Sequence, residues 1–160
     1  KEGISLKSGR KLECDIVVSA TGLDLKFMGG VEIIVDGKSV DFSETVSYKS
    51  MMFSNVPNMA LAFGYTNASW TLKCDLSNQY VCRLLNYMNL HEYTKACPRQ
   101  NDPTLEMGPW LDFTSGYIMR YIDNLPKVGN KAPWKLQHDY LFDRKMIKKG
   151  KVDDGIMEFS

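Results

Sequence analysis

The sequence predicts an α/β protein in which the strands come first and the helices last. Three observations lead to this prediction. Short apolar and β-branched runs, separated by turn residues, extend as far as Phe63. A long run with helical periodicity begins at Ser69, and two shorter helical patterns follow it. An α+β order also fits this arrangement. Because the regular strand–helix alternation of a complete doubly wound domain is missing, we expect the chain to be the closing part of a larger fold.

Two hairpins are predicted in the first quarter of the chain. Ile4, Leu6 and Leu12 alternate with polar residues around a turn at residues 7–10. A second hairpin is expected over residues 31–42, where Asp-Gly-Lys at residues 36–38 supplies the turn.

Three further runs favour strands. Residues 14–19 are mostly apolar and β-branched, which suits a strand buried on both faces of a parallel sheet. Residues 46–53 indicate another strand. Residues 59–63 follow a turn at residues 55–58 and predict a buried strand.

The helical part begins with an amphipathic run from Ser69 to about Asn89. Residues 97–103 have the composition of a linker, and helical patterns are expected over residues 113–125 and 136–148. Trp110 and Trp134, each preceded by proline, are predicted to anchor this tail.

Composition excludes several functional classes. The chain has 160 residues, 44% of them apolar and 24% charged, as in a soluble globular domain. The net charge of +1 gives no electrostatic reason for a nucleic-acid partner, and no apolar run is long enough for a transmembrane segment. The four cysteines lack metal-site spacing, so reduced cytoplasmic thiols and no metal are expected. The start at Lys1, without Met or a signal peptide, predicts a truncated piece.

The stretch GYTNASW joins a predicted strand to the predicted long helix. Such a turn presents free backbone N–H groups and the positive end of a helix dipole. Gly64 would let another group approach the backbone, and Thr66, Asn67 and Ser69 are candidate N-caps. The first turn, residues 70–73, contains no Asp or Glu, which leaves room for a ligand carbonyl or anion. The alternative is an ordinary capped helix with Trp70 in the core.

A second small-residue feature is Ala20-Thr21-Gly22, directly after the run at residues 14–19. It permits a close backbone crossing between two domains or beside a bulky cofactor, or it forms a simple turn. His91 and His138 are expected to be structural or exposed. No hydrolase, metalloprotease or P-loop motif is present, and no G-x-G-x-x-G can be fitted.

Three segments together resemble a known family: DIVVSATGLDL, FSNVPNMALAFGYTNASWTLKCDL and APWKLQHDYLFDRKMIKKG. They look like the C-terminal part of class B flavin-dependent monooxygenases, in the Baeyer–Villiger subgroup related to the ethionamide-activating monooxygenase. The resemblance covers nearly the whole chain, with the segments in the same order as in the family.

The resemblance implies a flavoprotein with two dinucleotide-binding domains, one for FAD and one for NADPH. Residues 1–95 would close the FAD domain, entered from the NADPH domain at Ala20, Thr21 and Gly22, and residues 96–160 would form a helical extension packed on it. The strand ending at Gly64 would be the last of the FAD sheet. The residues expected to line the pyrimidine edge of the flavin are Thr66, Asn67, Ala68, Ser69, Trp70 and Thr71.

The chemistry implied is reduction of FAD by NADPH, reaction with O2 to a C4a-peroxyflavin, and insertion of one oxygen atom into a small organic substrate. Substrates would be ketones or soft heteroatoms, sulfur or nitrogen. The resemblance suggests a cytoplasmic enzyme, with peripheral association at a membrane left open.

The chain departs from the family by lacking both G-x-G-x-x-G motifs and the F-x-G-x-x-x-H-x-x-x-W fingerprint. The family's active-site arginine also belongs to this missing N-terminal portion. No catalytic residue is therefore assigned, and the fragment alone is expected to be inactive. Two alternatives remain: a non-catalytic α+β binding or interaction module, and a flavin-dependent reductase of the same architecture.

Overall fold

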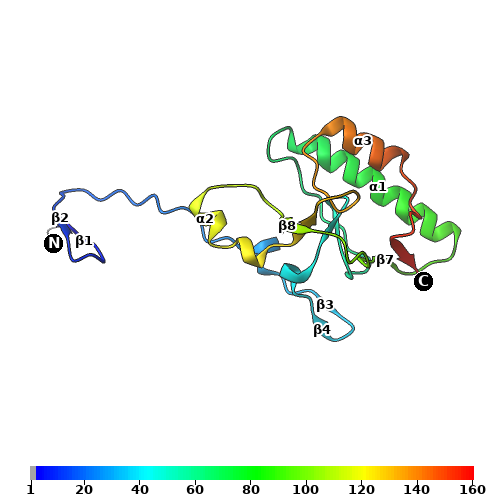
Figure 1. The fold of residues 1–160 in the computed structure, drawn as a ribbon, viewed down its shortest axis with the longest axis horizontal. Helices are drawn as coiled ribbons and strands as arrows, with labels where there is room; N and C mark the ends of the chain where they lie inside the picture. The colour runs from blue at the N-terminus through cyan, green and yellow to red at the C-terminus, as the bar shows by residue number, and fades with distance from the viewer. Residues whose placement is uncertain (1–2) are drawn as a thin grey trace.

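The computed structural model describes residues 3–160 and shows a small α/β protein with short antiparallel strand pairs and one long helix (Figure 1). The coarse α/β prediction is confirmed. In the described part of the chain the sheets are all two-stranded, and no parallel sheet is formed. The pairs are β1 (Ile4–Ser5) with β2 (Lys11–Leu12), β3 (Ile34–Val35) with β4 (Lys38–Ser39), β5 (Ser47–Tyr48) with β6 (Met52–Phe53), β7 (Ala96–Pro98) with β10 (Met157–Phe159), and β8 (Met107–Pro109) with β9 (Lys127–Gly129).

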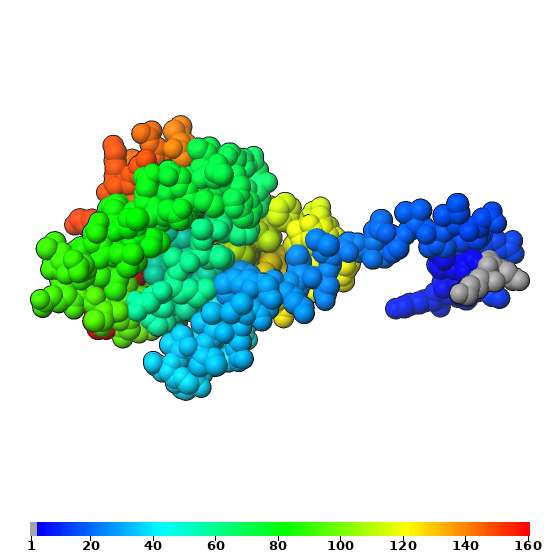
Figure 2. Space-filling view, turned by 180° about the vertical axis from the view of Figure 1, so that it is seen from behind, coloured from blue at the N-terminus to red at the C-terminus, as the bar shows by residue number. Residues whose placement is uncertain are grey.

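The N-terminal arm carries the first predicted hairpin and extends away from the body of the molecule (Figures 1 and 2). The prediction of a buried strand at residues 14–19 is wrong in this structure, because Ile16 is 81% exposed and Val18 85%. A strand of a parallel sheet needs a neighbouring strand and a cover over both faces of the sheet. Within residues 3–160 no strand lies beside this run, so its apolar side chains remain in solvent.

The second predicted hairpin is confirmed over a shorter span. Asp36 and Gly37 both have positive φ, 51° and 79°, as a two-residue type I′ turn requires. The hairpin leads into a short 3-10 helix, η2 (Phe42–Glu44), in which the Ser43 amide donates to the side chain of the N-cap Asp41. A 3-10 turn, η1 (Phe27–Gly30), precedes the hairpin.

Residues 46–53 form a tight hairpin and not the single strand that was predicted. Lys49 and Ser50 lie at its tip with φ of 50° and 60°, and neither residue type signals such a turn. The strand predicted at residues 59–63 is also wrong, since it forms no ladder and only the Leu61 amide bonds back, to the Met51 carbonyl at 2.7 Å. Exposure alternates along it between intermediate and exposed, so none of its five residues is fully buried as was expected.

The predicted long helix is confirmed as α1 (Trp70–Leu90). The helix α3 (Tyr140–Lys149) begins later than its predicted start and lies against α1 (Figure 1). The predicted helix at residues 113–125 is reduced to α2 (Gly116–Met119), which begins after the N-cap Ser115 and ends at the C-cap Arg120, and to the 3-10 helix η3 (Ile122–Asn124). Residues 96–98, partly assigned to a linker, pair with the C-terminal strand.

The main core lies between α1, α3 and the hairpin β5–β6. The residues of this core come from both sides of the domain boundary predicted between residues 95 and 96. The boundary itself stays a prediction. Trp110 and Trp134 are both buried, as anchors of the tail should be. The buried core residues are Val46, Tyr48, Met51, Met52, Leu76, Tyr80, Leu84, Met88, Ala96, Leu105, Trp134, Ile147, Val152 and Met157.

Candidate functional site

The turn that leads into α1 is open to solvent. Gly64 and Tyr65 are buried, whereas residues 67–71 are exposed. Ser69 occupies the N-cap position, as one of the three predicted candidates, but its side chain accepts no hydrogen bond from the helix. Its hydroxyl instead lies 3.0 Å from the Thr71 hydroxyl. The first backbone N–H groups of α1 therefore lack the side-chain acceptor that usually satisfies them.

The electrostatics of this helix end favour a negatively charged or carbonyl-bearing ligand. The first turn of α1 contains no acidic residue. The helix is 21 residues long, so its dipole is well developed and its positive end lies at the exposed turn. Uncapped N–H groups and a positive helix end together form the kind of site that binds anions and polar heteroatoms.

The aromatic side chain of Trp70 borders the turn. Trp70 as a whole residue is 49% exposed, and its ring packs edge-on against Phe63 with the centroids 4.7 Å apart. The Phe63 ring centroid in turn lies 4.7 Å from that of Trp110. The group that approaches Gly64 closely is Trp70 itself, because a Cβ at Gly64 would overlap the indole and lie 2.7 Å from the Trp70 Cα. Trp70 is thus packed against Phe63 and Gly64 and still partly exposed, so it remains available to a ligand.

A buried group of three polar side chains lies at the base of the turn. The Tyr65 hydroxyl donates to Asp143 Oδ2 at 2.7 Å, and Lys73 Nζ donates to the same oxygen at 2.8 Å. The Lys73 and Asp143 side chains are only 2% and 1% exposed. Burial lowers the pKa of Lys73 against the opposing effect of Asp143, and burial together with the hydrogen bond to Asp143 raises the pKa of Tyr65.

This group was missed in the sequence because its members are distant along the chain. A signal did exist: Lys73 falls on the same helix face as Leu76 and Tyr80, and Asp143 lies one turn before the buried Ile147. A charge at such a position needs a partner.

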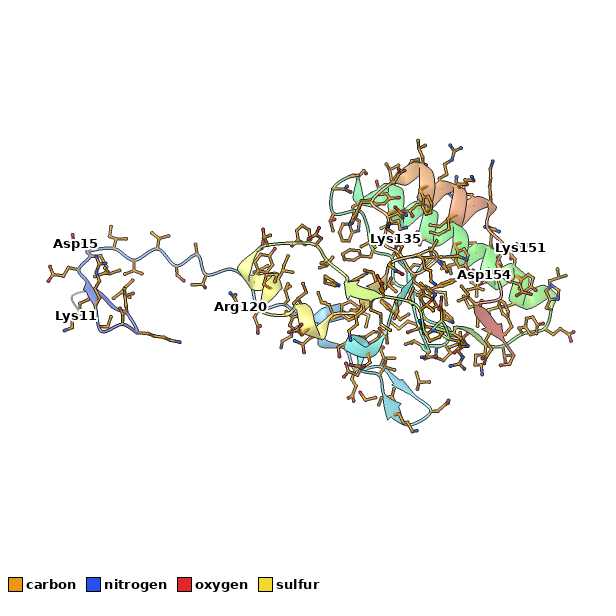
Figure 3. The ribbon with its side chains drawn as sticks, viewed as in Figure 1. Lys11, Asp15, Arg120, Lys135, Lys151 and Asp154 are labelled. Carbon is orange, nitrogen blue, oxygen red and sulfur yellow. The ribbon has the colours of Figure 1, made fainter. Side chains whose placement is uncertain are left out.

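A second cluster of the same residue types lies elsewhere in the core. Asp154 Oδ2 accepts from the Tyr48 hydroxyl at 2.5 Å and from Lys49 Nζ at 2.9 Å. Tyr80 completes it, and burial raises the pKa of Tyr80 to about 12. The cluster joins the hairpin β5–β6 to α1 and to the C-terminal segment, where Figure 3 labels Asp154. None of the hydrogen bonds of this cluster, within residues 3–160, reaches the turn at residues 66–69.

The small residues Ala20, Thr21 and Gly22 lie where the arm meets α2. Gly22 has φ of 85°, and a Cβ there would lie 3.1 Å from the Cβ of Tyr117. Arg120, labelled in Figure 3, donates to the Thr21 carbonyl at 3.5 Å. The segment therefore passes close to another part of the chain, but at α2 and not at the turn.

The remaining candidates are peripheral. His138 Nδ1 lies 3.5 Å from the Thr66 hydroxyl, so the tail reaches the turn. His91 packs against the rings of Tyr87 and Tyr93. All four cysteines are free thiols. Among residues 3–160 no three metal-ligating side chains gather, and no helix of the described part is long and apolar enough to cross a membrane.

Comparison with known proteins gives strong matches to one group of flavoproteins. The chain is 47% identical over 158 residues to the FAD-containing monooxygenase EthA of Mycobacterium tuberculosis, covering 99% of this chain and 32% of that protein. It is 47% identical to AlmA of Acinetobacter baylyi, whose name reads "probable FAD-binding monooxygenase", and 43% identical to MymA of Mycobacterium tuberculosis, whose name reads "putative FAD-containing monooxygenase". The chain spans about a third of the length of each relative. No family model matches, and no solved structure matches.

Proposed function

The chain belongs to the EthA-like FAD-containing monooxygenases, of which it represents about a third, and on this premise we propose that it forms their C-terminal third and supplies the flavin-facing end of α1. One observation carries the proposal. The turn at residues 66–71 presents uncapped helix N–H groups and no acidic side chain, and it is exposed on a chain whose relatives contain FAD.

The residues of the turn fit the pyrimidine edge of a flavin. That edge carries carbonyl oxygens and gains negative charge on reduction, so it matches N–H donors at a positive helix end. We assign this contact to Thr66, Asn67, Ala68, Ser69, Trp70 and Thr71. Gly64 contributes indirectly, since it admits Trp70.

For the whole protein we propose an NADPH-dependent monooxygenase with two dinucleotide-binding domains. Residues 1–95 would complete the FAD domain, with the crossing from the NADPH domain at residues 20–22, and residues 96–160 would pack on it. A small organic molecule, a ketone or a compound with soft sulfur or nitrogen, would receive one oxygen atom from O2. The flavin supplies this oxygen-transfer chemistry when bound. The chain's own part is to orient the ring edge and to stabilise negative charge on it.

Two substitutions of Ser69 in the full-length protein test the proposal. Ser69→Asp and Ser69→Asn both provide a side-chain acceptor for the helix N–H groups and differ in charge. We expect the Asp variant to bind FAD about tenfold more weakly than the Asn variant, roughly 1.4 kcal/mol, because its carboxylate occupies the positive helix end and repels the electron-rich ring edge. FAD dissociation constants measure the difference. Equal constants for the two variants would show that the turn does not face the flavin.

A further inference from the structure

The buried carboxylate of Asp143, in α3, accepts hydrogen bonds from Tyr65 and Lys73, which lie on either side of the turn at residues 66–69. We propose that Asp143 is a positioning residue for the flavin site: it holds Tyr65, and through it the turn at residues 66–69, in place against the start of α1. The inference rests on the proposed function, because it takes this turn to be the part that contacts FAD.

The geometry places one oxygen atom between the two ends of the turn. Tyr65 is the residue before the turn and Lys73 closes the first turn of α1 after it, and both donate to Asp143 Oδ2. Lys73 Nζ also lies 5.7 Å from the centroid of the Tyr65 ring. Tyr65 and Lys73 are therefore held by the same carboxylate, and this fixes both ends of the exposed segment that lies between them in the sequence.

Asp143 is itself held firmly, so it can act as a fixed point. At the start of α3, the Asp139 side chain accepts from the amides of Leu141 and Phe142 at 2.8 and 3.0 Å. At its end, the Arg83 guanidinium of α1 donates to the carbonyls of Ile147 and Gly150, the latter at 2.7 Å. Both ends of α3 are thus satisfied, and Asp143 between them does not depend on the turn for its position.

Residues 66–69 make few other hydrogen bonds. Within residues 3–160, their one other side-chain hydrogen bond to the tail joins the Thr66 hydroxyl and His138 Nδ1, at the long distance of 3.5 Å. The packing of Trp70 on Phe63 holds the start of α1, not residues 66–69. The side chains from Asn67 to Thr71 are exposed. Removing the bond from Tyr65 to Asp143 would therefore release the turn more than it would disturb the core.

The cluster of Tyr65, Lys73 and Asp143 orients the turn more than it stabilises the folded protein. Asp143 Oδ1 is buried and accepts no hydrogen bond within the protein, so the ion pair is incompletely compensated. Well-packed apolar residues often replace such a buried pair without loss of stability. What an apolar pair could not reproduce is the directed bond to the Tyr65 hydroxyl.

Two charge-neutral double variants in the full-length, FAD-containing protein isolate that bond. Lys73→Met with Asp143→Asn keeps an acceptor for Tyr65, whereas Lys73→Met with Asp143→Leu removes it. We expect the Asn double variant to bind FAD within about threefold of the parent, and the Leu double variant about tenfold more weakly, with altered visible circular dichroism of the flavin. Thermal unfolding of the apoprotein should be similar for the two. Equal FAD affinity in both double variants, with unchanged circular dichroism, would overturn the inference.

The Asp154 cluster provides a matched control because it contains the same Tyr, Lys and Asp chemistry away from the turn. Lys49→Met with Asp154→Asn or Asp154→Leu should leave FAD affinity unchanged between the two. If this control pair differs as much as the Asp143 pair, the effect is a general consequence of core damage and the inference fails. Should the Asp143 variants not fold, Tyr65→Phe decides: we expect a threefold weaker FAD affinity, and parental affinity would overturn the inference.

The Ser69 variants separate this failure from that of the proposed function. If Ser69→Asp weakens FAD binding and the Asp143 variants do not, the turn faces the flavin but is not positioned by Asp143. If Ser69→Asp and Ser69→Asn bind equally, the proposed function falls and the positioning role falls with it.

Discussion

At the scale of single residues, Gly64 and Trp70 share one small space. A side chain at Gly64 would occupy the position of the Trp70 indole and crowd the Trp70 backbone. The indole is held there by Phe63, which in turn packs on the buried Trp110. The position of the partly exposed Trp70 therefore depends on a residue six positions earlier having no Cβ.

Gly64→Ala tests this dependence, and Gly108→Ala is its control because a Cβ at Gly108 meets nothing within 4 Å. We expect Gly64→Ala to destabilise the protein by about 1–3 kcal/mol through overpacking, and to weaken FAD binding because Trp70 is displaced. Gly108→Ala should change neither property. Thermal unfolding and FAD titration of both variants make the comparison, and a Gly64→Ala variant that matched the parent would contradict the packing.

At the scale of secondary-structure elements, the two main helices begin in opposite ways. The helix α3 starts with Asp139 accepting from two backbone amides, and Asp143 lies in its first turn. The helix α1 starts without a capping bond or an acid. Since α1 is the longer helix and its start is exposed, its unsatisfied end is the one available to a ligand.

Alanine substitution at the two N-cap positions should reveal the contrast. We expect Asp139→Ala to lower the free energy of unfolding by about 1 kcal/mol, the usual cost of losing a capping side chain. Ser69→Ala should cost close to nothing in the apoprotein, because the Ser69 side chain caps nothing. Chemical denaturation of both variants measures this, and a similar loss for each would mean that Ser69 does cap α1 in solution.

Sequence reasoning predicted the elements that depend on local signals. The hairpin at Asp36-Gly37 and the helix from Trp70 follow from turn chemistry and from apolar periodicity. The hairpin at Lys49-Ser50 was missed because positive φ at these two residues is imposed by tertiary contacts: the Lys49 amide donates to Pro133 and its ammonium group to Asp154. At the site, the open start of α1 was predictable, whereas the link from Tyr65 to Asp143 spans 78 residues and has no local signature.

At the scale of the whole molecule, the chain combines a packed body with an arm whose apolar side chains lie in solvent (Figures 1 and 2). Ile16 and Val18 have the composition of a buried strand and no strand beside them in residues 3–160. The relatives are about three times as long as this chain. A strand buried on both faces would need neighbouring strands that residues 3–160 do not supply.

Amide hydrogen exchange of the full-length protein, with and without FAD, tests the central claim most directly. The claim is that the first N–H groups of α1 face the flavin. We expect FAD to slow exchange of the amides at residues 67–72, while those of β7 exchange at the same rate in both states because that strand follows the opposite end of α1. If FAD protects other segments and leaves residues 67–72 unchanged, the start of α1 does not contact the flavin.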